Sequence, residues 1–176
     1  MKGALLTKRD IERLLRDLGS ELAKDGVKGE LYLVGGAVMC LAHDARAATR
    51  DLDGLFRPSK QVRAAAARVA LANDLPESWI NDAVKGFFSE RGSFTTYLVL
   101  PHLTVFVADP AYLLAMKCLS ARIGAEFHDI DDVRYLLRYL NIATLAAAKQ
   151  TLADYYPLER FPQKTLYLLE ELLSAS

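Results

Sequence analysis

Two adjacent glycines and two nearby aspartates stand out in residues 31–56, LYLVGGAVMCLAHDARAATRDLDGLF. Gly35 and Gly36 follow a short apolar run, and Asp51 and Asp53 are separated only by Leu52. Glycine has no Cβ, so its backbone can approach an anion closely, and the amides that open the next helix would point at that anion. Carboxylates two residues apart on a strand share a face and suit Mg²⁺ that bridges to substrate phosphates. The segment therefore suggests a site with a phosphate at one end and a metal at the other.

Each half of this pattern also has a plainer interpretation. Gly35 and Gly36 can serve only the geometry of a strand-to-helix turn, and Asp51 and Asp53 can be a solvated strand edge. The combination is more specific, because the spacing leaves room for one helix that returns the chain to a neighbouring strand. The residues just before Asp51 add cationic and hydroxyl groups near the phosphate end: Arg46, Thr49 and Arg50.

Hydrophobic periodicity predicts the elements that position these residues. We expect an amphipathic helix over residues 7–24, a strand over 30–34, a short helix over 37–42, a second strand over 51–56 and a helix opened by Pro58 and Ser59. Residues 94–100 and 102–107 read as strands, either a hairpin or consecutive strands. Helices are then predicted over 112–123, 129–140, 143–155 and 163–173, the first with Asp109 as its cap.

These elements predict an α+β fold. A small mixed sheet flanked by helices forms an α/β core over residues 1–109, and a C-terminal helical bundle over 110–176 packs on it. No Gly/Ser-rich linker divides the two parts, so we expect one compact unit.

Composition sets the cellular context. Lys plus Arg and Asp plus Glu number 22 each, so there is no overall basic field for nucleic acid. Cys40 and Cys118 lie in apolar runs and read as buried reduced thiols, which suits the cytoplasm. Charge appears too early for a signal peptide, and no apolar run approaches the about 20 residues that cross a bilayer. The three histidines and two cysteines have no zinc-site spacing.

The glycine pair followed by Arg46-x-x-Thr49-Arg50-Asp51-Leu52-Asp53 resembles the signature of the nucleotidyltransferase superfamily of the polymerase-β type. The Arg-x-x-Thr-x-Asp-x-Asp variant is most similar to its AbiEii-like branch, which includes toxins of bacterial toxin–antitoxin pairs and uncharacterised relatives. Residues 76–88, PESWINDAVKGFF, are similar to a segment of an uncharacterised bacterial nucleotidyltransferase-like family. Residues 113–137 resemble the Leu-x-x-x-Lys…Arg…Asp-x-x-Asp segment of such proteins, so the likeness spans about residues 30–140.

The resemblance implies a reaction and its groups. Asp51 and Asp53 would bind Mg²⁺, and Gly35, Gly36 and the following helix would hold a nucleoside triphosphate (NTP). A hydroxyl of an RNA (for instance tRNA) or a protein would attack the α-phosphate and release pyrophosphate. In the helical half, Lys117 would face the phosphates and Arg122 would brace the cluster. Asp129, or alternatively Asp132, would be the acidic residue. An antitoxin is a further implied partner. Without the resemblance, Lys117 reads as a residue that snorkels from a packed helix, and the aspartates as helix-start carboxylates.

One departure leaves two alternatives open. Many active members carry a third carboxylate on a later strand, whereas the interior of HLTVFVAD, residues 102–109, has none. Either Asp129 supplies it, or the chain is a non-catalytic relative that binds a nucleotide or a partner. For an RNA acceptor, the candidate footprint beside the site, which can also be a solvated helix face, comprises Arg46, Arg50, Arg57, Lys60, Arg63 and Arg68.

Overall fold

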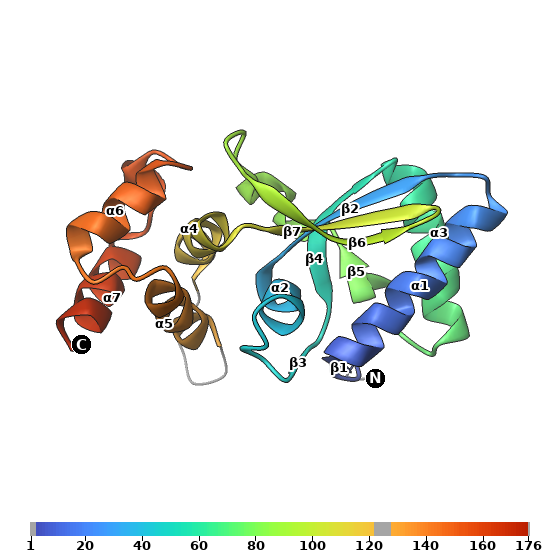
Figure 1. The fold of residues 1–176 in the computed structure, drawn as a ribbon, viewed down its shortest axis with the longest axis horizontal. Helices are drawn as coiled ribbons and strands as arrows, with labels where there is room; N and C mark the ends of the chain where they lie inside the picture. Colours follow the sequence, from blue (N-terminus) through green and yellow to red (C-terminus); the bar gives the residue numbers. More distant parts are fainter. Residues whose placement is uncertain (1–2, 122–127, 176) are drawn as a thin grey trace. The chain divides into compact units, whose positions relative to one another are not determined.

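The computed structural model describes residues 3–121 and 128–175 (Figure 1). In these ranges it contains seven α-helices, a five-stranded mixed sheet and a two-stranded sheet, which confirms the predicted α+β class. The chain divides into two compact units. Unit 1 comprises Met1–Gly86 and Phe94–Ala108, and unit 2 comprises Phe87–Ser93 and Asp109–Ser176. The described ranges contain no helix that is both long and apolar enough to span a membrane.

The large sheet of unit 1 has the strand order β5-β4-β2-β7-β6. β2 (Gly29–Val34) is central, antiparallel to β4 (Leu52–Arg57) and parallel to β7 (Leu103–Ala108). The outer strands are β6 (Phe94–Leu100), antiparallel to β7, and β5 (Ile80–Asn81), parallel to β4. β6 and β7 form the hairpin that was one of the two sequence alternatives, with Pro101 and His102 between them.

Helices α1 (Lys8–Lys24) and α3 (Ser59–Ala72) lie side by side against this sheet (Figure 1). A Cβ added to Gly29 of β2 would lie 2.8 Å from Leu22 of α1 and 3.3 Å from Val62 of α3, so side chains of both helices meet at this glycine. The predicted apolar face of α1 is fully buried, at Ile11, Leu14, Leu15, Leu18 and Leu22. Burial on this scale dominates the stability of the unit.

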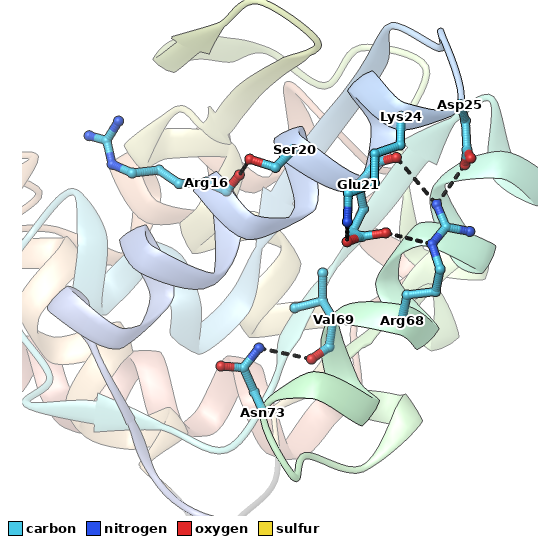
Figure 2. Close-up of polar contacts among 8 residues, drawn as sticks. All are labelled: Arg16, Ser20, Glu21, Lys24, Asp25, Arg68, Val69 and Asn73. Atoms are coloured by element: carbon cyan, nitrogen blue, oxygen red, sulfur yellow. Dashed lines mark hydrogen bonds and ion pairs between the residues drawn. The ribbon is translucent and has the colours of Figure 1, made fainter.

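Polar contacts align the exposed sides of the same two helices. Figure 2 shows the Arg68 guanidinium of α3 between two carboxylates of the α1 end, 2.6 Å from Glu21 and 2.6 Å from Asp25. Asp25 caps α1, and Gly26 follows with φ +66°, the left-handed conformation that glycine adopts without strain. The helix therefore ends where the sequence predicted.

The connections of unit 1 are short. α2 (Gly35–Leu41) joins β2 to the loop before β4. That loop contains β3 (Ala48–Thr49), which pairs antiparallel with β1 (Leu6–Thr7). Two 3₁₀ turns, Glu77–Trp79 and Ala83–Phe87, flank β5. The buried Trp79 indole donates to the Ala66 carbonyl of α3 at 3.0 Å.

Unit 2 contains α4 (Pro110–Ser120), α5 (Asp129–Tyr139), α6 (Leu145–Ala153), the 3₁₀ turn Leu158–Arg160 and α7 (Gln163–Ser174). Its centre is the fully buried Tyr112, whose hydroxyl accepts from the Ser89 amide at 2.9 Å. Ser89 also donates to the Tyr155 carbonyl at 2.5 Å, and Tyr156 donates to the Phe87 carbonyl. These bonds hold segment 87–93 in the helical unit.

Candidate functional site

The structure brings the glycines and one aspartate together at the end of β2. The register pairs Val34 with Asp53, so Asp53 lies opposite the last residue before Gly35. A Cβ added to Gly35 would lie 3.3 Å from Asp53 Oδ2, and Gly35 has φ +68°. Only glycine combines that backbone with so close a neighbour without strain. Leu52 is fully buried and Asp53 is half-buried, so the two alternate as residues on opposite faces of a strand do.

Arg46 and Thr49, which precede Asp51 in the sequence, lie against Gly36. A Cβ added there would lie 2.5 Å from Arg46 Nη1 and 3.0 Å from Thr49 Oγ1. The guanidinium and the hydroxyl therefore lie directly against the first turn of α2. Thr49 is 7% exposed, and its hydroxyl donates to the Asp51 carbonyl at 3.3 Å. Gly35, Gly36, Arg46, Thr49 and Asp53, which we call the glycine–aspartate site, thus form one cluster within unit 1.

Asp51 and Arg50 lie just outside the strand. β4 begins at Leu52, so strand alternation sets the direction of Asp53 but not that of Asp51. Asp51 is half-buried, and Arg50 is exposed.

The donor chemistry of this cluster fits Mg²⁺. Mg²⁺ takes hard oxygen ligands, commonly one or two carboxylates, and fills its remaining positions with water and substrate phosphate oxygens. Asp53, with Asp51 two residues before it, offers carboxylate oxygens, and Arg46 places a cation for phosphate close by. Within residues 3–121 and 128–175, no group of three His, Cys, Asp or Glu side chains could hold a metal ion.

The helical candidates meet in unit 2. Lys117 Nζ of α4 lies 2.5 Å from Asp132 Oδ2 and 3.4 Å from Asp129 Oδ1, both on α5. All three side chains are buried, with 7%, 2% and 9% of their surface exposed, in that order. An ammonium in such a place needs opposite charge, because taking it from water costs several kcal/mol. The shorter contact makes Asp132 the principal ion partner of Lys117, and the ion pairs link α4 to α5.

The remaining candidates are placed as follows. Arg122 lies outside the described residues. The interior of β7 carries Thr104 and Phe106 on its half-buried face and no carboxylate, as the sequence indicates. Burial raises the pKa of the Cys118 thiol to about 12 and lowers the pKa of His43, so the first is an inert core thiol and the second favours the neutral imidazole.

The basic footprint is partly neutralised by the protein itself. Arg63 lies 3.0 Å from Asp82 and over the Phe56 ring, and Arg68 is held by Glu21 and Asp25. Arg57 lies over the Tyr32 ring, with its carbon 5.7 Å from the ring centroid. Arg63 and Arg68 would have to leave carboxylates to contact phosphate. Arg46 lies against Gly36.

Sequence reasoning did not identify the elements that hold Thr49 in place. β1 and β3 are two residues each and leave no periodic signal. The spacing of Thr7 and Asp10 is typical of a capping box at the start of a helix, but nothing in the sequence connects that helix start with the site. Comparisons of the chain with protein-family models, with curated proteins and with solved structures give no match.

Proposed function

We propose that the protein transfers a nucleoside monophosphate from an NTP to a hydroxyl of an RNA, for instance tRNA, or of a protein, with Mg²⁺ as its cofactor. The observation that carries this proposal is the contact of Gly35 with Asp53. A backbone suited to phosphate and a carboxylate suited to a metal on that phosphate are adjacent, although 17 residues separate them in the sequence. The resemblance to the polymerase-β type superfamily rests on these same residues.

The glycine–aspartate site, together with Asp51, would bind the phosphates at one end and the metal at the other. The amides at Gly35 and Gly36 would face the phosphates, and the Arg46 guanidinium would pair with a phosphate oxygen. Asp51 and Asp53 would hold Mg²⁺, which when bound supplies positive charge for the phosphates and orients them. The acceptor hydroxyl would attack the α-phosphorus, form the new oxygen–phosphorus bond and release pyrophosphate. The protein's contribution would be position and charge.

Lys117 and Asp129 could take part in this reaction only by giving up their present ion pairs. Their side chains are already in contact with each other, and Asp132 shares Lys117. For Lys117 to contact a phosphate, its ammonium would have to exchange a carboxylate for that phosphate.

A second candidate function is binding without catalysis. It is favoured by the lack of a third metal-binding side chain beside Asp53 among the described residues, together with the apolar and hydroxyl interior of β7. Such a protein would bind a nucleotide or a partner, an antitoxin for instance. Both candidate functions require an NTP or a bacterial partner protein such as an antitoxin. We therefore propose that the protein acts in the cytoplasm, where these are present.

Transfer of label separates the candidates. The protein is incubated with α-labelled NTPs, Mg²⁺ and total RNA, in parallel with Asp51→Asn, Asp53→Asn and the exposed control Asp17→Asn. The enzyme proposal expects label on RNA or protein with the wild type and Asp17→Asn, and its loss with Asp53→Asn. Equal transfer by both site variants would exclude the proposed metal site. Nucleotide binding by calorimetry without any transfer would support the binding protein.

A further inference from the structure

The first strand of the chain holds the segment that supplies Arg46 and Thr49. Leu6 pairs with Thr49 and Thr7 pairs with Ala48 in an antiparallel ladder. Thr49 in turn lies against Gly36, and its hydroxyl donates to the Asp51 carbonyl. Contacts therefore run from the N-terminal strand through Thr49 to Gly36 and to the backbone of Asp51, just before β4.

Burial shows which side of β1 makes this contact. Leu6 is 4% exposed and its partner Thr49 is 7% exposed, whereas the neighbouring Leu5 is 63% exposed. Within β1, Leu6 is buried and Thr7 is exposed, because successive side chains of a strand point to opposite faces. Leu6 is thus an inward-facing apolar residue of a strand only two residues long, and its removal would leave a buried gap beside Thr49.

The strand leads directly into α1, whose apolar face is fully buried. Thr7 is the N-cap of α1 and forms a capping box with Asp10, whose carboxylate accepts from the Thr7 amide at 2.9 Å and from its hydroxyl at 2.7 Å. Lys8, the first residue of α1, lies 3.4 Å from Asp44 of the loop that carries Arg46. The body of α1 is locked in the core by its fully buried leucines. The start of α1 therefore contacts both ends of residues 44–49, Asp44 through an exposed ion pair and Thr49 through β1.

We infer that β1 is a positioning strand for the glycine–aspartate site, with Leu6 as the positioning residue. It sets residues 44–51 so that Arg46 and Thr49 lie against Gly36 before any ligand arrives. A preformed loop avoids the entropy cost of ordering it on binding, so loosening β1 weakens the affinity for the ligand phosphates. The role of this strand in phosphate binding rests on the proposed function, whereas its effect on the order of the loop does not.

The test compares Leu6→Ala with Leu5→Ala and with Leu6→Met, which keeps the volume of the side chain. Amide hydrogen exchange is measured over residues 44–51 and, as an internal reference, over the core turns of α1. Leu6→Ala is expected to speed exchange in 44–51 by about tenfold or more relative to wild type, with the α1 core unchanged. Leu5→Ala and Leu6→Met are expected to exchange like the wild type. Equal exchange in Leu6→Ala and Leu5→Ala would overturn the inference.

Calorimetry with Mg²⁺ and a non-hydrolysable NTP then tests the functional half. Leu6→Ala is expected to raise the nucleotide Kd about tenfold. Leu6→Met, which keeps the volume of the side chain, is expected to bind the nucleotide with the Kd of the wild type. Faster exchange of 44–51 with an unchanged Kd would overturn the positioning role. If the wild type binds no nucleotide, the proposed function fails, and the exchange result still decides whether β1 orders the loop.

Discussion

Replacing Gly35 by alanine tests the contact on which the site is built, and the chain contains a matched control. Gly35 and Gly26 have nearly the same backbone, φ +68° and φ +66°. A Cβ at Gly26 meets nothing within 4 Å, whereas a Cβ at Gly35 lies 3.3 Å from Asp53 Oδ2 and 3.8 Å from Asp53 Cβ. The two substitutions therefore share the backbone strain and differ in the contact with Asp53.

The magnitude follows from these geometries. The left-handed conformation costs an alanine about 1–2 kcal/mol, and the loss of unfolded-state entropy offsets about 0.4–1 kcal/mol. Gly26→Ala should therefore lower stability by about 1 kcal/mol, or about 2–4 °C in Tm. Gly35→Ala should cost about 1 kcal/mol more, at the low end for overpacking, because a Cβ at 3.3 Å from Asp53 Oδ2 requires a shift of only a few tenths of an ångström.

The assay is thermal and urea unfolding followed by the fluorescence of Trp79, the single tryptophan, which is buried in unit 1. A double-mutant cycle with Asp53→Ala isolates the contact, since that variant removes Oδ2 and leaves only the ordinary contact at 3.8 Å. The extra cost of Gly35→Ala should then vanish. The reasoning is refuted if Gly35→Ala and Gly26→Ala cost the same, or if the excess persists without the Asp53 carboxylate.

Three other predictions concern contacts outside that pair. Lys117→Met should cost about 3–5 kcal/mol in urea unfolding, because it removes a buried ammonium that contacts two buried carboxylates. Arg134→Met, at the exposed pair with Asp131, should cost less than about 1 kcal/mol, and similar losses in the two variants would contradict the buried ion pair. Gly92→Ala places a Cβ 2.4 Å from the buried Tyr112 ring and should cost about 1–3 kcal/mol, while Gly86→Ala, with nothing within 4 Å, should be nearly neutral. Hydrogen bonds and charge from Lys24 and Arg68 lower the pKa of Glu21 below its ordinary 4.5, so its stabilising contacts are present above that pH and lost as pH falls through the lowered pKa. Carboxyl NMR titration should show a rise in the Glu21 pKa in Arg68→Gln, and no rise would exclude the contact in Figure 2.

The sequence predicts the elements of unit 1 that have a long apolar period. The face of α1 and the run that becomes β2 bury complete side chains, so their pattern is strong, and each begins within a residue of its expected position. β4 begins one residue later than expected, which leaves Asp51 outside the strand. β1, β3 and β5 were not predicted, because two-residue strands depend on a partner distant in sequence.

The candidate site divides in the same way. The spacing of one helix between two strands predicted that the glycines and the aspartates lie on neighbouring strands. The structure adds that Gly35 lies beside Asp53 and that Arg46 and Thr49 lie against Gly36. The sequence placed Arg46 and Thr49 near the phosphate end, but not specifically against Gly36, because residues 42–47 have no regular structure and are held through β1. The pairing of Lys117 with Asp132 in preference to Asp129 depends on helix packing, which spacing alone does not determine.

Metal-dependent nucleotide binding tests the central claim most directly. Calorimetry with a non-hydrolysable NTP, with and without Mg²⁺, is run on the wild type, on Asp53→Asn and on the exposed control Asp17→Asn. The proposed site predicts Mg²⁺-dependent binding by the wild type and Asp17→Asn, and its loss in Asp53→Asn while Trp79 fluorescence shows a folded unit 1. Mg²⁺-dependent binding of equal affinity in all three proteins would contradict the assignment of Asp53 to the site.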